Sequence, residues 1–213
     1  VAVDPNGDIY CAGYTQSTSG IATVGAYQTT NAGGTDGMLV KFDGAGNRLW
    51  ATYYGGGANE QTNYGKAVTT DASSNVFVVF TSFSPGVAVG GFQTTYGGSG
   101  DGLLVKFNAS GNFQWSTYYG GNSAPGSEFG LGVATDASGN VYYCGALATP
   151  GLAFGGFQNT MNGSSDAILV KFNPAGGRIW ATYYGGSNGE SGNCVSTDSS
   201  GNIFMSGSTS SPS

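Results

Sequence analysis

The sequence predicts an all-β fold, an array of four-stranded antiparallel sheets with about 65 residues per sheet. The phrase Trp-Ala/Ser-Thr-Tyr-Tyr-Gly-Gly occurs three times, and its tryptophans, Trp50, Trp115 and Trp180, stand 65 residues apart. A composition of 40 Gly, 13 Tyr and 12 Phe suits many short strands joined by tight turns. No segment has a sustained 3.6-residue apolar period, so we expect essentially no helix.

Three further elements recur and divide the chain into units. An aspartate and the lysine of a Leu-Val-Lys-Phe run, five residues later, recur as Asp36 and Lys41, Asp101 and Lys106, and Asp166 and Lys171. The element Tyr/Phe-Gln-Thr/Asn-Thr begins at Tyr27, Phe92 and Phe157, and a turn phrase begins at Asp4, Asp71, Asp136 and Asp198. The sequence therefore predicts a single repeat array over residues 1–213, with units at approximately 1–65, 66–130 and 131–192 and a partial unit at 193–213.

Each unit is expected to contain four strands, which in the second unit lie near Lys66–Thr70, Asn75–Ser82, Gly102–Phe107 and Asn112–Tyr119. The aspartate of each turn phrase is expected to cap its own backbone, while Gly or Asn supplies a positive φ. Runs such as Val-Phe-Val-Val-Phe are apolar on both strand faces, as expected where each sheet packs between two neighbours. Repeated sheets of this kind are typical of β-propeller blades, and the strict spacing favours them over one large β-sandwich.

The predicted array has three full blades plus a half blade, whereas propellers close with roughly 4–8 blades. Two explanations stay open. The chain is a fragment of a longer one, which we favour, or its exposed terminal sheets are completed by other copies of itself. An unpaired sheet edge is a template for strand addition, so the second explanation implies head-to-tail assembly.

The repeated phrases resemble the SBBP-type bacterial β-propeller repeat. The resemblance rests on Trp-Ala/Ser-Thr-Tyr-Tyr-Gly-Gly, Asp-x-Ser-Gly-Asn-Val-Tyr, Phe-Gln-Thr-Thr and Asp-Gly-Leu-Leu-Val-Lys-Phe, and it covers nearly the whole chain. It implies a secreted or cell-surface protein of Bacteroidetes-like bacteria, often with a separate C-terminal sorting domain. It implies no shared catalytic residues.

The charge pattern argues against nucleic-acid and membrane partners. Lys and Arg together number 6 and the net charge is -6, too few cations to neutralise a run of phosphates. There is no apolar run long enough to span a bilayer. No signal-like segment opens the sequence, so we expect any signal peptide to lie outside these residues.

The sequence contains no histidine, which removes the usual base of a catalytic triad and the commonest metal ligand. Gly185–Gly189 matches GxSxG, but it leads into a glycine-rich loop and we interpret it as a chance match. Asp4, Asn6 and Asp8 have the spacing that begins a calcium loop, but the later copies lose these ligands, which favours a hairpin turn. We expect no cofactor, no metal and no catalytic residue.

Three sets of repeated side chains are candidate site residues. Glu60, Glu128 and Glu190 follow each Tyr-Tyr-Gly-Gly, and paired carboxylates can perform glycosidase chemistry, but recurrence in every blade favours a solvated or capping role. Lysines within apolar strands need partners, so Lys41, Lys106 and Lys171 are expected to pair with carboxylates or carbonyls between blades, with Asp36, Asp101 and Asp166 as candidates. The alternative is a basic ring that binds an anionic ligand.

The aromatic residues and cysteines have two interpretations each. The repeated tryptophans and the tyrosines after them suit interblade packing, with sugar stacking as the alternative. Cys144 and Cys194 fall on strands of successive units, where a disulfide is possible, but free buried thiols are favoured, and Cys11 has no CxxC partner. Ligand specificity is expected in the variable loops, Ser84–Gly91 and Gly121–Ser127.

These features predict a non-enzymatic structural or adhesive module of a secreted or cell-surface bacterial protein that assembles head-to-tail. Its expected partners are other copies or the remainder of a longer chain. The alternative is a carbohydrate- or protein-binding propeller that uses its loop face.

Overall fold

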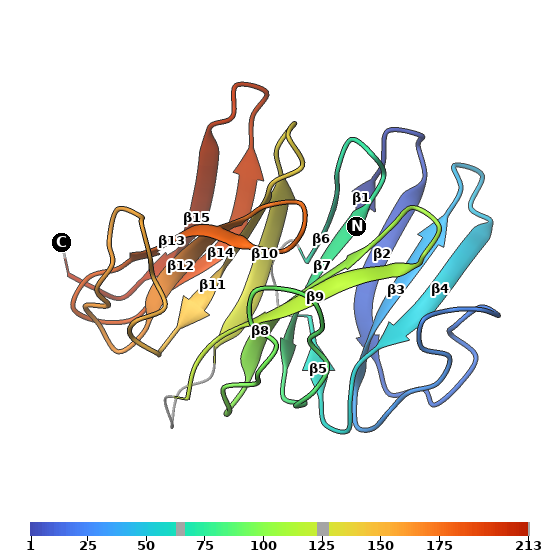
Figure 1. Cartoon of the computed structure of the whole chain (residues 1–213), viewed down its shortest axis with the longest axis horizontal. Coiled ribbons are helices and arrows are strands. Elements are labelled where there is room, and N and C mark those ends of the chain that lie inside the picture. The colour runs from blue at the N-terminus through green and yellow to red at the C-terminus, as the bar shows by residue number, and fades with distance from the viewer. Residues whose placement is uncertain (63–66, 123–127, 213) are drawn as a thin grey trace.

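The computed structural model describes residues 1–62, 67–122 and 128–212, and within these ranges it contains strands, turns and loops but no helix (Figure 1). In the same ranges, no helix of the length and apolar character that a membrane crossing needs is found. Four antiparallel sheets follow one another along the chain, and we call them blades 1 to 4. The predicted propeller-like array of three full blades and one half blade is confirmed.

The blades have the following strands. Blade 1 contains β1 (Ala2–Val3), β2 (Ile9–Thr15), β3 (Asp36–Phe42) and β4 (Arg48–Tyr54). Blade 2 contains β5 (Glu60–Gln61), β6 (Val68–Thr70), β7 (Val76–Ser82), β8 (Asp101–Phe107) and β9 (Phe113–Tyr119). Blade 3 contains β10 (Phe129–Thr135), β11 (Val141–Leu147), β12 (Asp166–Phe172) and β13 (Arg178–Tyr184). Blade 4 contains β14 (Glu190–Thr197) and β15 (Ile203–Thr209).

The first strand is irregular in blades 2, 3 and 4. In blades 3 and 4 it has a bulge, between Gly130 and Gly132 and between Gly192 and Cys194. In blade 2 its two pieces, β5 and β6, both pair with β7. The strand expected near Lys66–Thr70 is seen at Val68–Thr70, and Lys66 lies outside the described residues.

The turn between the first and second strands forms as the sequence predicts. In blade 3, Oδ1 of Asp136 accepts the backbone N–H groups of Ser138 and Asn140, each at 2.9 Å. Gly139 has a φ of +75°, which a glycine adopts without the Cβ clash of other residues. In the same way Asp4 accepts the N–H groups of Asn6 and Asp8, so this acidic cluster forms a hairpin turn.

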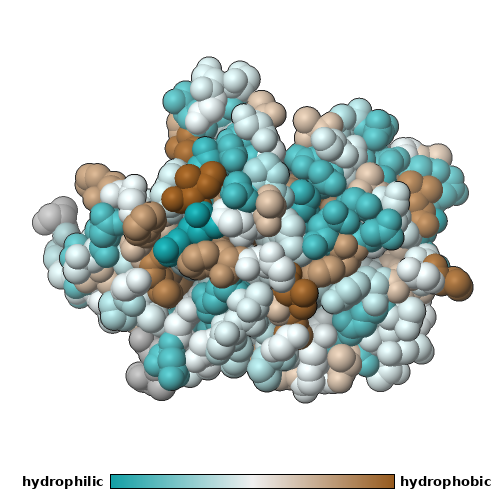
Figure 2. All heavy atoms as spheres, in the orientation of Figure 1, coloured by the Kyte–Doolittle hydropathy of each residue, from teal (hydrophilic) through white to brown (hydrophobic). Residues whose placement is uncertain are grey.

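The hydrophobic core lies between the blades rather than inside one sheet. Every residue of β7 and of β11 is buried, because each of these strands has a neighbouring blade on both faces. By contrast, most residues of β15 are exposed. On the surface seen in Figure 2, hydrophobic side chains occur in separate small patches among polar ones. The predicted packing of apolar strand faces between blades is therefore confirmed for the central blades.

Aromatic side chains fill the junctions, and small residues on the facing strand make room for them. A Cβ on Gly37 would lie 2.5 Å from the ring of Phe80, and a Cβ on Gly102 would overlap the hydroxyl of Tyr143. The third residue at this repeat position is Ala167, and there the facing side chain is the narrower Met205. Residue size is thus matched across each junction separately.

Candidate functional site: the blade junctions

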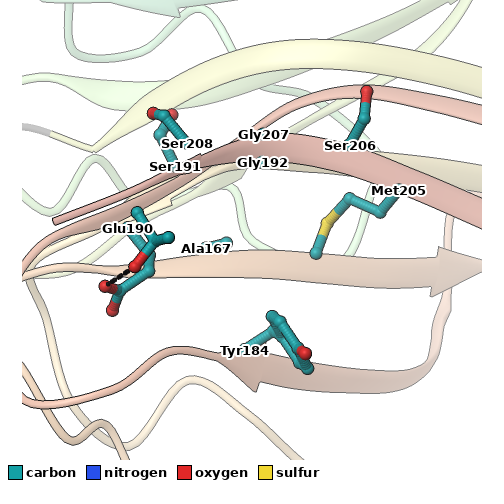
Figure 3. Close-up of a pocket in the computed structure, with 10 residues that line it drawn as sticks. Ala167, Tyr184, Glu190, Ser191, Gly192, Met205, Ser206, Gly207 and Ser208 are labelled. Atoms are coloured by element: carbon teal, nitrogen blue, oxygen red, sulfur yellow. Dashed lines mark hydrogen bonds between the residues drawn. The ribbon is translucent and has the colours of Figure 1, made fainter. Parts of the chain in front are cut away.

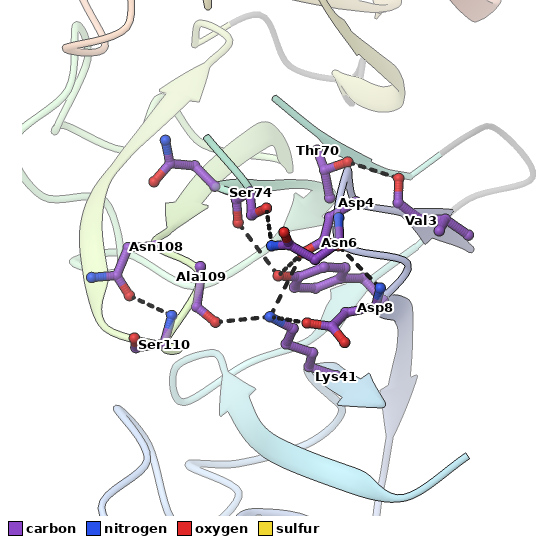
Figure 4. A network of polar contacts seen from close by, with 12 residues as sticks. Val3, Asp4, Asn6, Asp8, Lys41, Thr70, Ser74, Asn108, Ala109 and Ser110 are labelled. Atoms are coloured by element: carbon purple, nitrogen blue, oxygen red, sulfur yellow. Dashed lines mark hydrogen bonds and ion pairs between the residues drawn. The ribbon is translucent and has the colours of Figure 1, made fainter. Parts of the chain in front are cut away.

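The lysine of blade 1 lies in a polar network that joins two blades (Figure 4). Nζ of Lys41, on β3, is 2.9 Å from Oδ2 of Asp8 and 3.7 Å from Oδ2 of Asp4. It also donates to the carbonyl of Ala109 in blade 2 at 3.2 Å. Burial lowers the pKa of Lys41, but its bonds to Tyr10 and Asp8 outweigh burial and raise that pKa. The buried ammonium is therefore held charged.

Trp50 and Trp115 each donate to the same carbonyl as the repeated lysine of their own blade. Nε1 of Trp50 donates to the Ala109 carbonyl at 3.1 Å. In the next junction Lys106 and Trp115 both donate to the carbonyl of Pro174, at 3.0 and 3.1 Å. One carbonyl, at the turn between the third and fourth strands, thus receives two donors from the preceding blade.

The glycine two residues after each of these carbonyls provides the surface on which the indole rests. Gly111 and Gly176 have φ values of +81° and +85°, and a Cβ on either would lie 2.9 Å from the tryptophan ring. Trp50 and Trp115 therefore have the interblade role that their recurrence predicts.

The predicted aspartate partners of the lysines are wrong. The carboxylates near Lys41 belong to the first turn, and Lys171 likewise lies 3.7 Å from Asp136. Asp36 and Lys41 are five residues apart on one strand, and residues at odd separations point to opposite faces of a sheet. The correct part of the prediction is the carbonyl of the neighbouring blade.

The repeated aspartates instead hold the long loop of their own blade. Oδ2 of Asp36 accepts from Nε2 of Gln28 at 2.5 Å and from the N–H of Ala32 at 2.9 Å. Oε1 of Gln28 accepts the N–H of Gly55 at 2.9 Å. Gln158 bridges Asp166 and Gly185 in the same way. The glutamine was not singled out from the sequence, although its position in Tyr/Phe-Gln-Thr/Asn-Thr repeats at each unit.

A buried glutamate of the following blade lies beside each of the first two aspartates. Oδ1 of Asp36 and Oε2 of Glu60 both lie within 2.6 Å of the point that a Cβ on Gly55 would occupy. Oε2 of Glu60 accepts the N–H of Gly56 at 2.9 Å, so this glutamate caps the Tyr-Tyr-Gly-Gly turn. Of the expected solvated or capping role, capping is correct for Glu60, and the solvated alternative is wrong because Glu60 and Glu128 are fully buried between blades.

Burial changes the titration of these acids. It raises the pKa of Asp101 to about 6 and that of Glu128 to about 7, and the charge of Asp101 also raises the pKa of Glu128. Oδ1 of Asp101 and Oε2 of Glu128 have no donor among the described residues. A proton held by one carboxyl of such a pair relieves the repulsion between two buried charges. Both side chains are closed off from solvent, so a sugar cannot reach them for glycosidase chemistry.

The last tyrosine of β4 and the last tyrosine of β9 close the first and second junctions from the other side. The hydroxyl of Tyr54 donates to the carbonyl of Val87 at 2.5 Å, and that of Tyr119 donates to the carbonyl of Leu152 at 2.6 Å. Both acceptors lie in the long loop of the following blade, so at least part of the variable loop Ser84–Gly91 serves blade packing. In the other variable loop, residues 123–127 lie outside the described residues.

A threonine ladder links the first strands of successive blades. Oγ1 of Thr70 donates to the carbonyl of Val3 at 3.1 Å, Thr135 donates to Thr70 at 2.8 Å, and Thr197 donates to Thr135 at 2.7 Å. The contact of Thr70 with Val3 is drawn in Figure 4. Each of blades 2, 3 and 4 is therefore bonded to the previous blade along its first strand as well.

On the face of blade 3 that is turned toward blade 4, the part that β14 and β15 do not cover lacks most of these contacts. Tyr184 is 62% exposed, whereas its equivalents Tyr54 and Tyr119 are 2% and 1% exposed. Beside Tyr184, a hollow of about 150 Å³ lies between β13 and the β14–β15 hairpin, lined by Ala167, Met205 and Glu190 (Figure 3). Its lining belongs to the junction that remains open, and within the described residues no cluster of three or more metal-ligating acids or cysteines is found.

The cysteines are free thiols. Cys144 on β11 is buried, and burial raises its pKa to about 12. Cys194 on β14 is exposed and Cys11 is half-buried. The expectation of buried thiols is correct for Cys144 and wrong for Cys194, because the half blade leaves β14 partly uncovered. Gly185–Gly189 forms the loop between β13 and β14, with no helix after it.

A comparison with known protein families gives one match, which lies in the last part of the chain. The family model SBBP, Beta-propeller repeat, matches residues 179–212. The match runs from β13 of blade 3 through both strands of blade 4, and thus spans one blade junction. It supports the repeat family that the recurring phrases resemble. No curated protein matches the chain.

Proposed function

We propose that the chain is a non-enzymatic structural module of a secreted or cell-surface bacterial protein, and that it associates with further repeat segments through its open terminal sheets. The observation that carries this proposal is the use of the repeated polar groups. The lysines, tryptophans and tyrosines of blades 1 and 2 all donate to carbonyls of the following blade. The motif residues therefore serve to stack one blade on the next.

Two further observations support an assembling scaffold. The match to a Beta-propeller repeat model suggests a non-catalytic repeat module. Blade 3 also exposes Tyr184 and Phe157, and blade 4 exposes the edge of β15, a hydrogen-bonding edge of the kind on which strands add. Filament growth and adhesion belong to the same proposal.

The test is the solution state of the purified chain. Sedimentation velocity over a wide concentration range, followed by electron microscopy, is expected to show rods or higher oligomers that grow with concentration. A strictly monomeric species at every concentration would contradict assembly. Retention of that monomer on a glycan array would favour the alternative, a loop-face lectin.

A further inference from the structure

A surface hollow crosses the first blade junction, beside the long loops of blades 1 and 2. Its volume is about 280 Å³, and its lining comes from both blades: Tyr27, Gln28, Tyr54 and Gly55 of blade 1, and Gly86 and Val87 of blade 2. None of these six residues is charged. Both blades have their full set of strands, so this hollow differs from the one at the open third junction.

The ring of Tyr27 forms one wall and lies flat over two other rings. Its centroid is 4.6 Å from that of Phe113 and 5.7 Å from that of Tyr54, with interplanar angles of 22° and 15°. The centroids of Phe113 and Tyr54 are 6.1 Å apart. If Tyr27 lay between them, two stacking intervals of about 3.5 Å would hold them about 7 Å apart. Both rings therefore lie on one side of Tyr27 and leave its other face uncovered, in agreement with an exposed fraction of 48%.

Three of the lining residues carry neutral polar groups that no protein group satisfies. Within the described ranges, the hydroxyl of Tyr27, the carbonyl of Gly55 and the N–H of Gly86 have no hydrogen-bond partner. The set thus contains an acceptor, a donor and a hydroxyl that can act as either. A few polar groups of this kind around an apolar surface are what a small-molecule site needs to orient its ligand.

The second junction shows that this combination is particular to the first. Phe92 stands in the place of Tyr27 and has no hydroxyl. The guanidinium of Arg178 lies 4.4 Å from the centroid of the Phe92 ring. The carbonyl of Gly120, the counterpart of the free carbonyl in the first junction, accepts from Nε2 of Gln93 at 3.0 Å. The repeat alone therefore does not produce the hollow, and the second junction serves as an internal control.

The chemistry of the hollow selects a neutral ligand with one apolar face and a polar rim. A pyranose ring has this form, because one face presents C–H bonds and the rim carries hydroxyls that both donate and accept. Polarised C–H bonds are attracted to the negative face of an aromatic ring. An anionic ligand such as a nucleotide is disfavoured, since no cationic side chain lines the hollow and the net charge of the chain is -6.

We propose that the first blade junction binds one neutral pyranose residue of a glycan, with the sugar stacked on the open face of Tyr27. Hydroxyls of the sugar bond to the Tyr27 hydroxyl, the carbonyl of Gly55 and the N–H of Gly86. The inference goes beyond the proposed structural role, because it assigns a small-molecule ligand to one junction. It does not depend on self-assembly, so the two proposals can fail separately.

The test is saturation-transfer NMR on the full chain, with the methyl glycosides of glucose, galactose and mannose as separate probes. At least one glycoside is expected to receive saturation and to shift the ring resonances of Tyr27. Glycerol, which has hydroxyls but no ring face, is expected to do neither. Titration into the millimolar range gives the dissociation constant. The inference is overturned if no methyl glycoside binds, or if glycerol binds as well as the best of them.

Substitutions at the two equivalent aromatic positions give a matched pair. Tyr27→Ala is expected to weaken binding by about tenfold or more, because the stacking and the hydroxyl contact are both lost. Tyr27→Phe keeps the ring that packs on Phe113, and it is expected to weaken binding by about threefold to tenfold. Phe92→Ala removes the equivalent ring of the second junction and is expected to leave the affinity unchanged.

Thermal unfolding of each variant shows whether its junction stays packed. Parent-like affinity in Tyr27→Ala, or an equal loss in Tyr27→Ala and Phe92→Ala, would place the sugar elsewhere and overturn the site. Oligomers formed by a chain that binds no glycoside would refute this site alone. Glycoside binding by a chain that stays monomeric would refute self-assembly alone.

Discussion

Tyr119 and Tyr184 are the same residue of the same repeated phrase, yet one is 1% exposed and the other 62%. The difference arises entirely from the neighbouring blade. Tyr119 is covered by the loop and the fourth strand of blade 3, whereas Tyr184 faces the two strands of blade 4 that lie within the described residues. A blade of this protein therefore does not bury its own apolar face, and its stability depends on the segment that follows it.

Removal of the indole at a closed junction and at the open junction is expected to give the largest difference in stability. Trp115→Ala is expected to lower the free energy of unfolding by about 3–5 kcal/mol, since a buried ring and its bond to Pro174 are both lost. Trp180→Ala, at the half-covered position, is expected to cost about 1–2 kcal/mol. Urea denaturation of both variants measures the difference, and equal losses would show that the two junctions are energetically alike.

The glycine that faces an aromatic ring gives the next largest contrast. Gly102→Ala is expected to destabilise the chain by about 1–3 kcal/mol, because the new Cβ overlaps the hydroxyl of Tyr143. The reverse change at the open junction, Ala167→Gly, is expected to cost only about 0.5–1 kcal/mol from backbone entropy. Thermal unfolding of the two variants is the measurement, and a tolerated Gly102→Ala would contradict the size matching.

The buried acids of the second junction predict a dependence of stability on pH. The pKa of Glu128 is about 7 in the folded protein and lies near the ordinary glutamate value of 4.5 when the chain is unfolded, with Asp101 as the neighbouring acid. The native state therefore holds extra protons between these values. Stability is expected to be highest near pH 4.5 and to fall by about 1–2 kcal/mol as the pH rises through 7.

Glu128→Gln tests the origin of this slope. An amide stays neutral at every pH, so in the variant the denaturation midpoint is expected to depend much less on pH between about 4.5 and 7, the window set by the two pKa values. Below pH 4 the parent and the variant are expected to lose stability together. The folded protein lowers the pKa values of Asp4 and Asp136, so protonation of these two carboxylates at low pH favours the unfolded chain. An unchanged slope in the variant would assign the effect to other groups.

The smallest expected effect is that of the lysine in the second junction. Burial lowers the pKa of Lys106, the charge of Asp71 opposes that shift, and the ammonium donates to Pro174. Lys106→Met loses this bond but also removes the cost of burying a charge, so a change within about 1 kcal/mol is expected. A loss of several kcal/mol, measured by urea denaturation, would show that the bond to Pro174 dominates.

Much of the fold could be predicted from the sequence because the repeat itself encodes it. The second, third and fourth strands of blade 2 lie within one residue of the expected positions. The turn aspartates and the interblade role of Trp50 and Trp115 also follow from local chemistry. These features depend on contacts that recur identically, so recurrence is enough to find them.

The missed features depend on which face of a strand a side chain occupies and on which blade a residue joins. Its position after Tyr-Tyr-Gly-Gly associates Glu60 with that turn, but Glu60 also begins the first strand of the next blade. Lys41 was paired with Asp36 by proximity in sequence, although strand alternation separates them. The match of Gly102 with Tyr143 joins residues 41 positions apart on different blades, and no periodic signal reveals it.

The shared carbonyl at each junction also gives the stack a fixed polarity. Lysine, indole and tyrosine donors all project from one face of a blade, and the carbonyls that accept them lie on the opposite face of the next. Two copies related by a twofold axis would bring donors against donors at these faces. Any complex that uses this chemistry is therefore heterologous, and it either closes into a ring or continues without a natural end.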